Sequence, residues 1–426
     1  MPEQTAKSNK TECGLDDPIR ACFRNAEQVN TSDAAFENRT AQTLGNAVRA
    51  ATAQSPAVKA TPFVWCDPSE IPPRDWLYGR HLIRRNISLT VAPGGVGKSS
   101  LTVVHALELA TGRRLLGHWL PEKPVRVWLF NLEDERRELE RRISAAMKHH
   151  RVSPTEIEGR LFVDTGREQE LVLADQQRDD VRLNTLLVEH LSEELRKRAI
   201  DVLIVDPFVS SHRVNEMDNG KIDVVAKQWV RLAEECRCAI ELVHHTRKLN
   251  GVEASSDSSR GASSLVNAAR SSRVLQRLDE DELQECGVRS EGSTYFSVKR
   301  DKANLASAGD REFYRTVTVD LGQGDQVGVV ERWRKPGLFD GVTLRDLKKV
   351  QEALGGKNLR YSAQTGEDWA GYTIASVLSL DPDKDKRRIK KLIEEWLKSG
   401  ALTKVDMKLA SGKTSPVLAV GEWATE

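Results

Sequence analysis

Short apolar segments alternate with amphipathic segments through the middle of the chain. Residues 87–91 alternate as a half-buried strand does, and 101–110 have the apolar spacing of a helix. The strands expected here are 87–91, 125–130, 161–163, 202–205 and 239–243; the helices are 101–110, 139–147 and 187–195. Strands that alternate with helices predict an α/β fold, with a parallel sheet covered on both faces.

The pattern changes after Ser272, where three β-rich segments follow one another at 295–298, 313–319 and 327–333. They either extend the sheet or form an antiparallel appendage. Pro336-Gly337 then indicates a linker. Beyond it we expect helices at 374–380 and 388–397 and a hairpin of 404–409 and 416–420 turning at Ser411-Gly412, which together resemble a small winged helix.

Residues 1 to about 60 are rich in Ala, Thr, Asn, Gln and Ser, which is typical of a disordered or loosely helical tail. A weak helix is expected at 32–54, and order is expected to begin near Phe63-Val64-Trp65. The chain therefore divides into a tail (1–60), an α/β domain (61–335) and a linker with a winged-helix-like domain (336–426).

Net charge, apolar runs and cysteine spacing limit the kinds of function that are expected for this chain. The 426 residues carry a net charge of +1, so any nucleic-acid binding must come from local basic patches. There is no long apolar run and no signal-peptide core, which predicts a cytoplasmic protein without a membrane partner. None of the six cysteines forms a C-x-x-C pair, so we expect reduced thiols rather than a zinc site or disulfides.

A glycine-rich loop follows the first strand of the sheet. It matches G-x-x-x-x-G-K-[ST] with alanine at the first glycine, and its nucleotide-binding candidates are Ala92, Pro93, Gly94, Gly95, Val96, Gly97, Lys98, Ser99 and Ser100. Glycines let backbone N–H groups converge on phosphate oxygens, and the next helix directs its positive end at them. Lys98, expected in an exposed loop, would hold the β and γ phosphates of ATP, and Ser99 would bind Mg²⁺. The alternative is a glycine-rich turn with a chance lysine.

Two acids follow apolar strands. Asp206 ends the run 202–205, where a carboxylate can hold Mg²⁺ through water; otherwise it begins a turn before Pro207. Glu133 follows the strand after the P-loop helix, which in a parallel sheet can lie beside the P-loop strand. There Glu133 could polarise an attacking water, or it could be an acid in the first turn of a helix.

His244-His245 end the strand 239–243, and on a strand they point to opposite faces, so they are poor joint metal ligands. One of the two histidines could hydrogen-bond the γ-phosphate. The alternative is that both histidines have only a structural role.

Together these motifs resemble the RecA-type ATPases, most closely the RepA-like hexameric replicative helicases of plasmids and phages. The resemblance covers about Trp76 to Asn304. Glu133-Asp134 is similar to the family's catalytic Glu-Asp pair, and His244-His245 with Lys248 resembles its His-His-x-x-Lys motif. The segment Ser259–Arg270 and Lys302-Ala303-Asn304 resemble two further motifs. The N-terminal tail and the C-terminal unit are additions to the minimal helicase.

The resemblance implies a RecA-like P-loop NTPase core that assembles into a hexameric ring with ATP between subunits. It implies that Glu133 activates water, that His245 acts as the sensor, and that Arg270 reaches the neighbouring subunit's ATP. The expected ligands are ATP, Mg²⁺ and single-stranded DNA, and arginine fingers contribute about 10³–10⁵ in rate.

Basic residues near the same sheet edge are candidates for single-stranded DNA, with solvated surface charge as the alternative: Arg213, Arg247 and Lys248. Arg387 and Arg388, in the basic segment that opens the second C-terminal helix, are candidates for duplex DNA; a protein-contact module is the alternative. Other functions that fit the core are a recombination or repair ATPase, a nucleotide-switched DNA-binding regulator and a small-molecule kinase.

Overall fold

The structure is a computed structural model that describes residues 59–246, 262–305, 310–322, 324–364, 366–408 and 414–425. The chain forms two compact units, Met1–Pro72 and Pro73–Glu426. The described part of the first unit is extended, apart from the 3₁₀ helix η1 (Pro68–Glu70), and its Phe63-Val64-Trp65 segment is exposed. The helix expected at 32–54 lies outside the described residues.

The second unit is built on a nine-stranded sheet in the order β14-β13-β12-β11-β3-β10-β8-β4-β5. Six strands are parallel: β3 (Ile87–Pro93), β4 (Val127–Asn131), β5 (Leu161–Thr165), β8 (Val202–Asp206), β10 (Ala239–Thr246) and β11 (Ser271–Arg277). The remaining three continue the sheet in antiparallel fashion: β12 (Tyr295–Ala303), β13 (Glu312–Gly322) and β14 (Asp325–Arg332). The β-rich segments after Ser272 thus extend the sheet.

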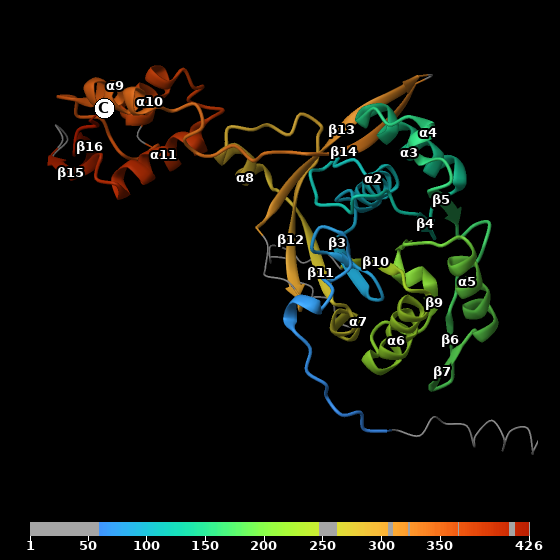
Figure 1. The fold of residues 1–426 in the computed structure, drawn as a ribbon. Helices are drawn as coiled ribbons and strands as arrows, with labels where there is room; N and C mark the ends of the chain where they lie inside the picture. Colours follow the sequence, from blue (N-terminus) through green and yellow to red (C-terminus); the bar gives the residue numbers. More distant parts are fainter. Residues whose placement is uncertain are drawn as a thin grey trace, which may run out of the picture. The chain divides into compact units, whose positions relative to one another are not determined.

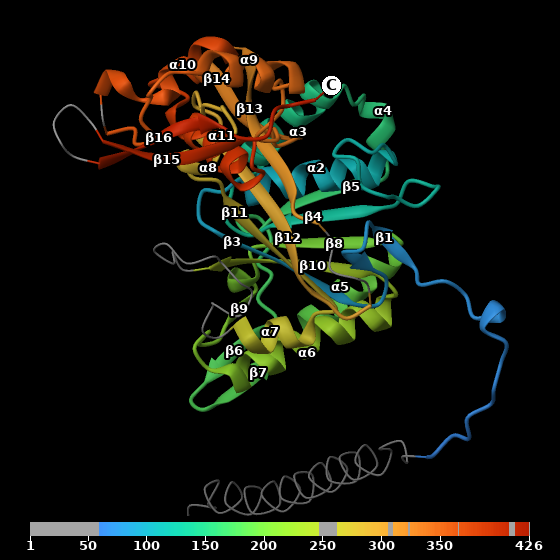
Figure 2. The same cartoon turned by 90° about the vertical axis from the view of Figure 1, so that its left-hand side faces the viewer.

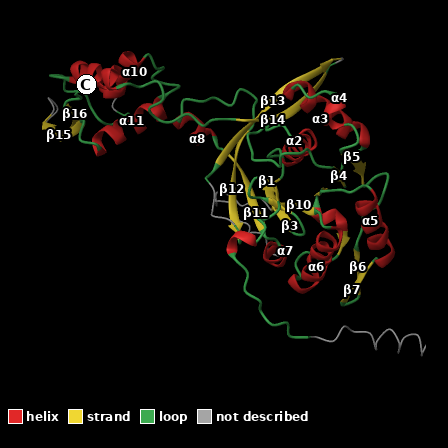
Figure 3. Ribbon diagram, viewed as in Figure 1, coloured by secondary structure: helices red, strands yellow, loops and turns green. Residues whose placement is uncertain are grey.

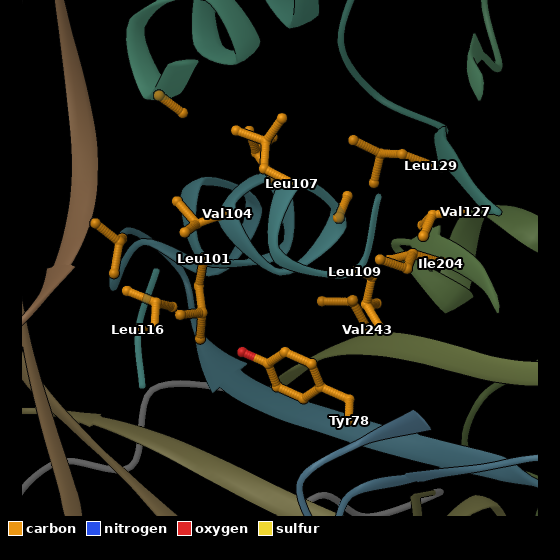
Figure 4. Close-up of a cluster of buried hydrophobic side chains, with 14 of the residues drawn as sticks. Tyr78, Leu101, Val104, Leu107, Leu109, Leu116, Val127, Leu129, Ile204 and Val243 are labelled. Carbon is orange, nitrogen blue, oxygen red and sulfur yellow. The ribbon is translucent and has the colours of Figure 1, made fainter. Parts of the chain in front are cut away.

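Helices cover both faces of the parallel strands (Figures 1 and 2). On one face lie α2 (Lys98–Thr111), α3 (Arg136–His150) and α4 (Pro154–Ile157), and on the other α5 (Thr185–Lys197), α6 (Asn219–Cys236) and α7 (Ala262–Ala268). Leu101, Val104 and Leu107 of α2 pack in one cluster with Leu129, Ile204 and Val243 of the strands (Figure 4). Because β8 is buried along its whole length, its residues 202–205 form a continuous apolar run before Asp206.

One expectation about strand order is wrong. β4 does not lie beside the P-loop strand β3, because β10 and β8 separate the two. Consecutive strands are often neighbours, but the crossover here carries β4 past two strand positions that later segments fill. The carboxyl ends of β3, β8 and β4 still share one edge of the sheet, because all three strands are parallel.

Smaller elements complete this unit. The hairpin of β1 (Trp76–Tyr78) and β2 (Leu82–Ile83) precedes β3, and α8 (Glu280–Glu285) lies between β11 and β12. A three-stranded sheet joins β7 (Asp180–Leu183), β6 (Ala174–Gln177) and β9 (His212–Arg213), with the 3₁₀ helix η2 (Phe208–Ser211) just before β9.

The described C-terminal residues form helices and a hairpin (Figure 3). They are α9 (Leu344–Leu354), α10 (Ala370–Leu378), α11 (Lys386–Lys398), β15 (Leu402–Lys408) and β16 (Thr414–Val420), with a short 3₁₀ helix η4 (Gly366–Asp368) before α10. They share a hydrophobic cluster centred on Trp369, Ile389 and Trp396. The helix α9 was not expected, and the expected turn at Ser411-Gly412 lies outside the described residues.

Among the described helices, none combines the length and the apolar character that a membrane span requires.

Candidate active site

The loop between β3 and α2 has a backbone that requires glycine. Gly95 has a φ of 76° and Gly97 a φ of 104°, both in the left-handed region, where a side chain would be strained. Ala92, which stands at the first glycine of the motif, is fully buried in the core under α2. The loop thus directs backbone N–H groups and the amino end of a 14-residue helix to one point, the arrangement that binds phosphates.

Lys98 is the first residue of α2 and is buried, so the expectation that it lies in an exposed loop is wrong. Its ammonium group folds back over the loop, where Nζ lies 3.0 Å from the Pro93 carbonyl oxygen and 3.0 Å from Nδ1 of His245. Burial lowers the pKa of Lys98, while the charges of Asp206 and Glu133 act in the opposite direction. The lysine is therefore placed to exchange these neutral acceptors for phosphate oxygens.

Asp206 ends β8 and is buried beside Ser99. Burial raises the pKa of this carboxyl to about 6, although the Ser99 hydroxyl bonds to it and Lys98 is nearby. Its Oδ2 has no hydrogen-bond partner among the described residues. A hydroxyl and a carboxylate oxygen are donors that Mg²⁺ prefers, so the pair fits the ion.

In the described ranges, no group of three or more His, Cys, Asp or Glu residues could hold a metal ion.

Glu133 lies in the turn between β4 and α3. The helix begins at Arg136 with Glu135 as its N-cap, so Glu133 stands outside the first helical turn. Its backbone N–H donates to Oδ1 of Asn131 over 3.0 Å, and its side chain is exposed. The Glu133 charge raises the pKa values of Lys98, Asp206 and His245, which puts the carboxylate near all three. A carboxylate at this position can accept a proton from water.

The two adjacent histidines face opposite sides of β10. His244 is buried, with its ring 6.0 Å from that of Phe208, and burial lowers its pKa to about 4. His245 faces Lys98, and its pKa is also lowered, first by burial and then by the lysine charge. A neutral imidazole beside Lys98 can accept a hydrogen bond from the ammonium group and donate one to a phosphate.

A cavity of about 570 Å³ opens at this point. It is lined by Gly95, Gly97, Lys98, Ser99, Ser100 and His245 of the expected set. Sequence reasoning missed its other walls, which are Glu138, Arg141 and Arg142 of α3 and residues 325–328 at the start of β14. Arg141 joins these walls, since its Nε lies 3.4 Å from Oδ2 of Asp325. A hairpin more than two hundred residues after the P-loop carries no sequence signal for this role.

Arg270 lies at the opposite edge of the sheet. It is exposed between α7 and β11, and its backbone N–H donates to Ile87 at the amino end of β3. Seven residues of β3 separate that edge from the P-loop, roughly 20 Å at the rise of a strand. Its carbonyl accepts from Asn304, so the segments at 270 and 302–304 lie together.

Of the residues predicted to bind DNA, the structure describes Arg213, Arg387 and Arg388. Arg213 on β9 is exposed and forms ion pairs with Glu170 and Asp175, whereas Arg247 and Lys248 lie outside the described residues. Arg387 forms an ion pair with Asp281 of α8. Arg388 donates to the Leu338 and Asp340 carbonyls.

A comparison with protein-family models finds that residues 52–251 match an AAA domain. The matched segment contains the glycine-rich loop, Glu133, Asp206 and His245, the residues that lie together around Lys98. The chain carries a P-loop ATPase domain. Its core is the α/β sheet described above, and such domains bind and hydrolyse nucleotide, usually with Mg²⁺. The match ends before Arg270 and the segment 302–304.

Proposed function

We propose that this P-loop ATPase is a RepA-like DNA helicase or single-stranded-DNA translocase that acts in the replication of a mobile element. The observation that carries the proposal is the separation of Arg270 from the P-loop. Lys98, Ser99, Asp206, Glu133 and His245 gather at one edge of the sheet, and Arg270 is exposed at the other.

The separation supports an ATP site shared between subunits. An arginine roughly 20 Å from its own phosphates cannot stabilise charge there, but it is free to approach the phosphates of a neighbour. Head-to-tail repetition of one such contact generates a closed ring or an open filament. We propose a hexameric ring, in which each Arg270 completes the site of the next subunit.

Within each site we propose the following roles. Lys98 and the loop N–H groups would bind phosphates, and Ser99 and Asp206 would hold Mg²⁺, which supplies charge neutralisation at the β and γ phosphates. Glu133 would accept the proton of the attacking water. His245, which bonds to Lys98, would sense the γ-phosphate and pass that state along β10.

DNA binding is proposed for two regions. The segment after β10, with Arg247 and Lys248, and Arg213 on β9 would meet the backbone of a single strand. The three C-terminal helices followed by the β15–β16 hairpin fit a winged helix, whose basic α11 would approach duplex DNA. The ion pairs of Arg213 and Arg387 would have to open for these contacts.

The test combines three measurements on the full chain. ATP turnover is measured with and without single-stranded DNA, particle mass is measured with and without ATP, and strand displacement is measured on a forked duplex. A helicase gives DNA-stimulated turnover, an ATP-dependent ring and displacement. Stimulated turnover on long filaments without displacement would instead favour a recombination or repair ATPase. Turnover that DNA does not change would favour a nucleotide-switched regulator.

A further inference from the structure

A second cavity, of about 620 Å³, lies on the α2 side of the sheet. It shares no lining residue with the cavity at the P-loop. Its walls come from the β1–β2 hairpin, from the segment after α2 and from strands β11 to β14. The nucleotide cavity opens at the amino end of α2, whereas this one adjoins the second half of the helix, where Arg273 bonds to His105 and Tyr78 bonds to Glu108.

The lining carries a surplus of positive charge. Five arginines line the cavity against two carboxylates, the residues being Arg74, Arg80, Arg273, Arg300 and Arg332 with Asp310 and Glu312. Arg273 is neutralised by the buried Glu241 at 2.6 Å, and Glu312 is bound to His118 at 3.1 Å. Arg74, Arg80 and Arg300 form no ion pair with any described residue. The unmatched guanidinium groups therefore favour an anion, and they suit phosphate oxygens in particular.

Aromatic rings stand beside these guanidinium groups. Trp76, Tyr78 and Trp119 line the cavity, and the Arg80 guanidinium lies 5.7 Å from the centre of the Trp76 ring. Trp119 is 51% exposed, so its indole is available for stacking. Aromatic residues interleaved with arginines are the combination that binds a base and its phosphate together.

Two buried donors of the lining residues point to the same ligand chemistry. The indole Nε1 of Trp76 and Nη1 of Arg300 have no acceptor among the described residues, although both atoms are buried. Trp76 itself is only 8% exposed. Buried donors without acceptors are rare in folded proteins, and a ligand rich in acceptor oxygens would supply acceptors for both once these side chains turn toward the cavity.

We propose that this cavity binds one nucleotide unit, with phosphate oxygens among Arg74, Arg80 and Arg300 and the base against Trp119. The volume is that of a small-ligand site and holds a single nucleotide rather than a passing strand. The same chemistry is offered by a free nucleotide and by the phosphorylated end of a single strand. The site is independent of whether the protein is a helicase.

The experiment is calorimetric titration of the full chain with ADP and Mg²⁺. We expect two ADP molecules per chain in the wild type and one in Lys98→Ala, which removes the P-loop contact. Arg80→Ala, an exposed position, should weaken the second site at least tenfold and leave the P-loop site unchanged; Arg300→Ala should do the same. Arg334→Ala, which changes an exposed arginine outside both cavities, is the control.

A second readout separates the two sources. Ligand in the cavity should quench tryptophan fluorescence, and Trp119→Phe should remove most of that quenching. If ADP does not quench but a 5′-phosphorylated trithymidylate does, and the unphosphorylated one does not, the ligand is a strand end. The proposal is overturned if neither probe binds in an Arg80-dependent way. If Arg80→Ala removes one ADP while Lys98→Ala removes none, the P-loop assignment fails and the cavity stands.

Discussion

Lys98 and His245 are hydrogen-bonded to each other, with Nζ of the lysine 3.0 Å from Nδ1 of the histidine. The bond links the first residue of the P-loop helix α2 to the carboxyl end of β10. An ammonium group has three N–H donors, so Lys98 can hold a phosphate oxygen and His245 together. The histidine is thereby coupled to the presence of phosphate, and β10 is also paired directly with β3, where His245 lies opposite Ala92.

Lys98→Ala should abolish ATP turnover and leave the fold intact. The ammonium charge at the phosphates is lost, while the free energy of unfolding should change little, because burial lowers the pKa of Lys98 and the charged group is therefore costly to bury. Phosphate release and thermal melting check both parts. Lys348→Ala, at an exposed position, should behave as wild type. Normal hydrolysis by Lys98→Ala would contradict the assignment of the loop.

Glu133→Gln should bind ATP with near wild-type affinity and hydrolyse it about 10²–10⁴-fold more slowly, because only the proton acceptor for water changes. The side chain is exposed, so folding should be unaffected. Binding is measured with a nucleotide analogue and turnover by phosphate release. Glu135→Gln, at the N-cap of α3, is the matched control. Loss of nucleotide binding in Glu133→Gln would mean a structural role instead.

Asp206→Asn should stabilise the nucleotide-free protein at neutral pH and abolish Mg²⁺-dependent turnover. Burial raises the carboxyl pKa from 3.8 to about 6, so the folded state binds the proton more tightly than the unfolded state. The wild type therefore loses stability as pH rises from about 4 to 6, by at most about 3 kcal/mol. Asn, which does not titrate, avoids that loss.

Melting temperatures measured in EDTA across pH 4 to 8 test this stability profile. Equal pH dependence in wild type and Asp206→Asn would rule out Asp206 as the cause.

Arg270→Ala should lose most of its turnover and regain part of it on mixing with Lys98→Ala subunits. Each mixed interface can pair an intact P-loop with an intact arginine, since the two residues lie at opposite edges of one sheet. Turnover is measured over a range of mixing ratios, and Arg277→Ala, at the other end of β11, is the control. If no ratio restores activity and ATP induces no assembly, the shared site is refuted.

Arg387→Ala should reduce the salt dependence of duplex binding by the full chain. Each lost phosphate contact lowers the slope of log K against log[salt] by about 0.9. The measurement compares this variant with Arg345→Ala on α9, at several salt concentrations. A wild type that does not bind duplex even at low salt would make the C-terminal helices a protein-contact module.

Local patterns in the sequence predicted the main strands and the P-loop well, because each depends on a contiguous segment. The apolar run 202–205 is β8, and the helix expected at 101–110 is the centre of α2. The helix α6 was missed although Ile222, Val225 and Trp229 have helical spacing; the hydrophilic start of the segment hid the pattern.

Other features are set by contacts between distant segments. The place of β4 beyond β8 depends on how crossovers pack, and the wall formed by β14 depends on three antiparallel strands that follow the ATPase motifs. The spacing of residues along the chain predicts neither the position of β4 nor the cavity wall formed by β14. The burial of Lys98 has the same origin, because His245 and the loop carbonyls that enclose it come together only in the fold.

The P-loop helix is held firmly at the end away from the nucleotide. Glu108, fully buried, accepts from the Tyr78 hydroxyl and from the Leu116 N–H, while His105 is bonded to Arg273 of β11. These hydrogen bonds connect α2 to the sheet and to the loop that follows the helix. We therefore expect α2 to stay fixed relative to the sheet. If the protein is the translocase proposed above, a conformational change on ATP turnover would pass through the strand ends that carry Asp206 and His245 rather than through α2.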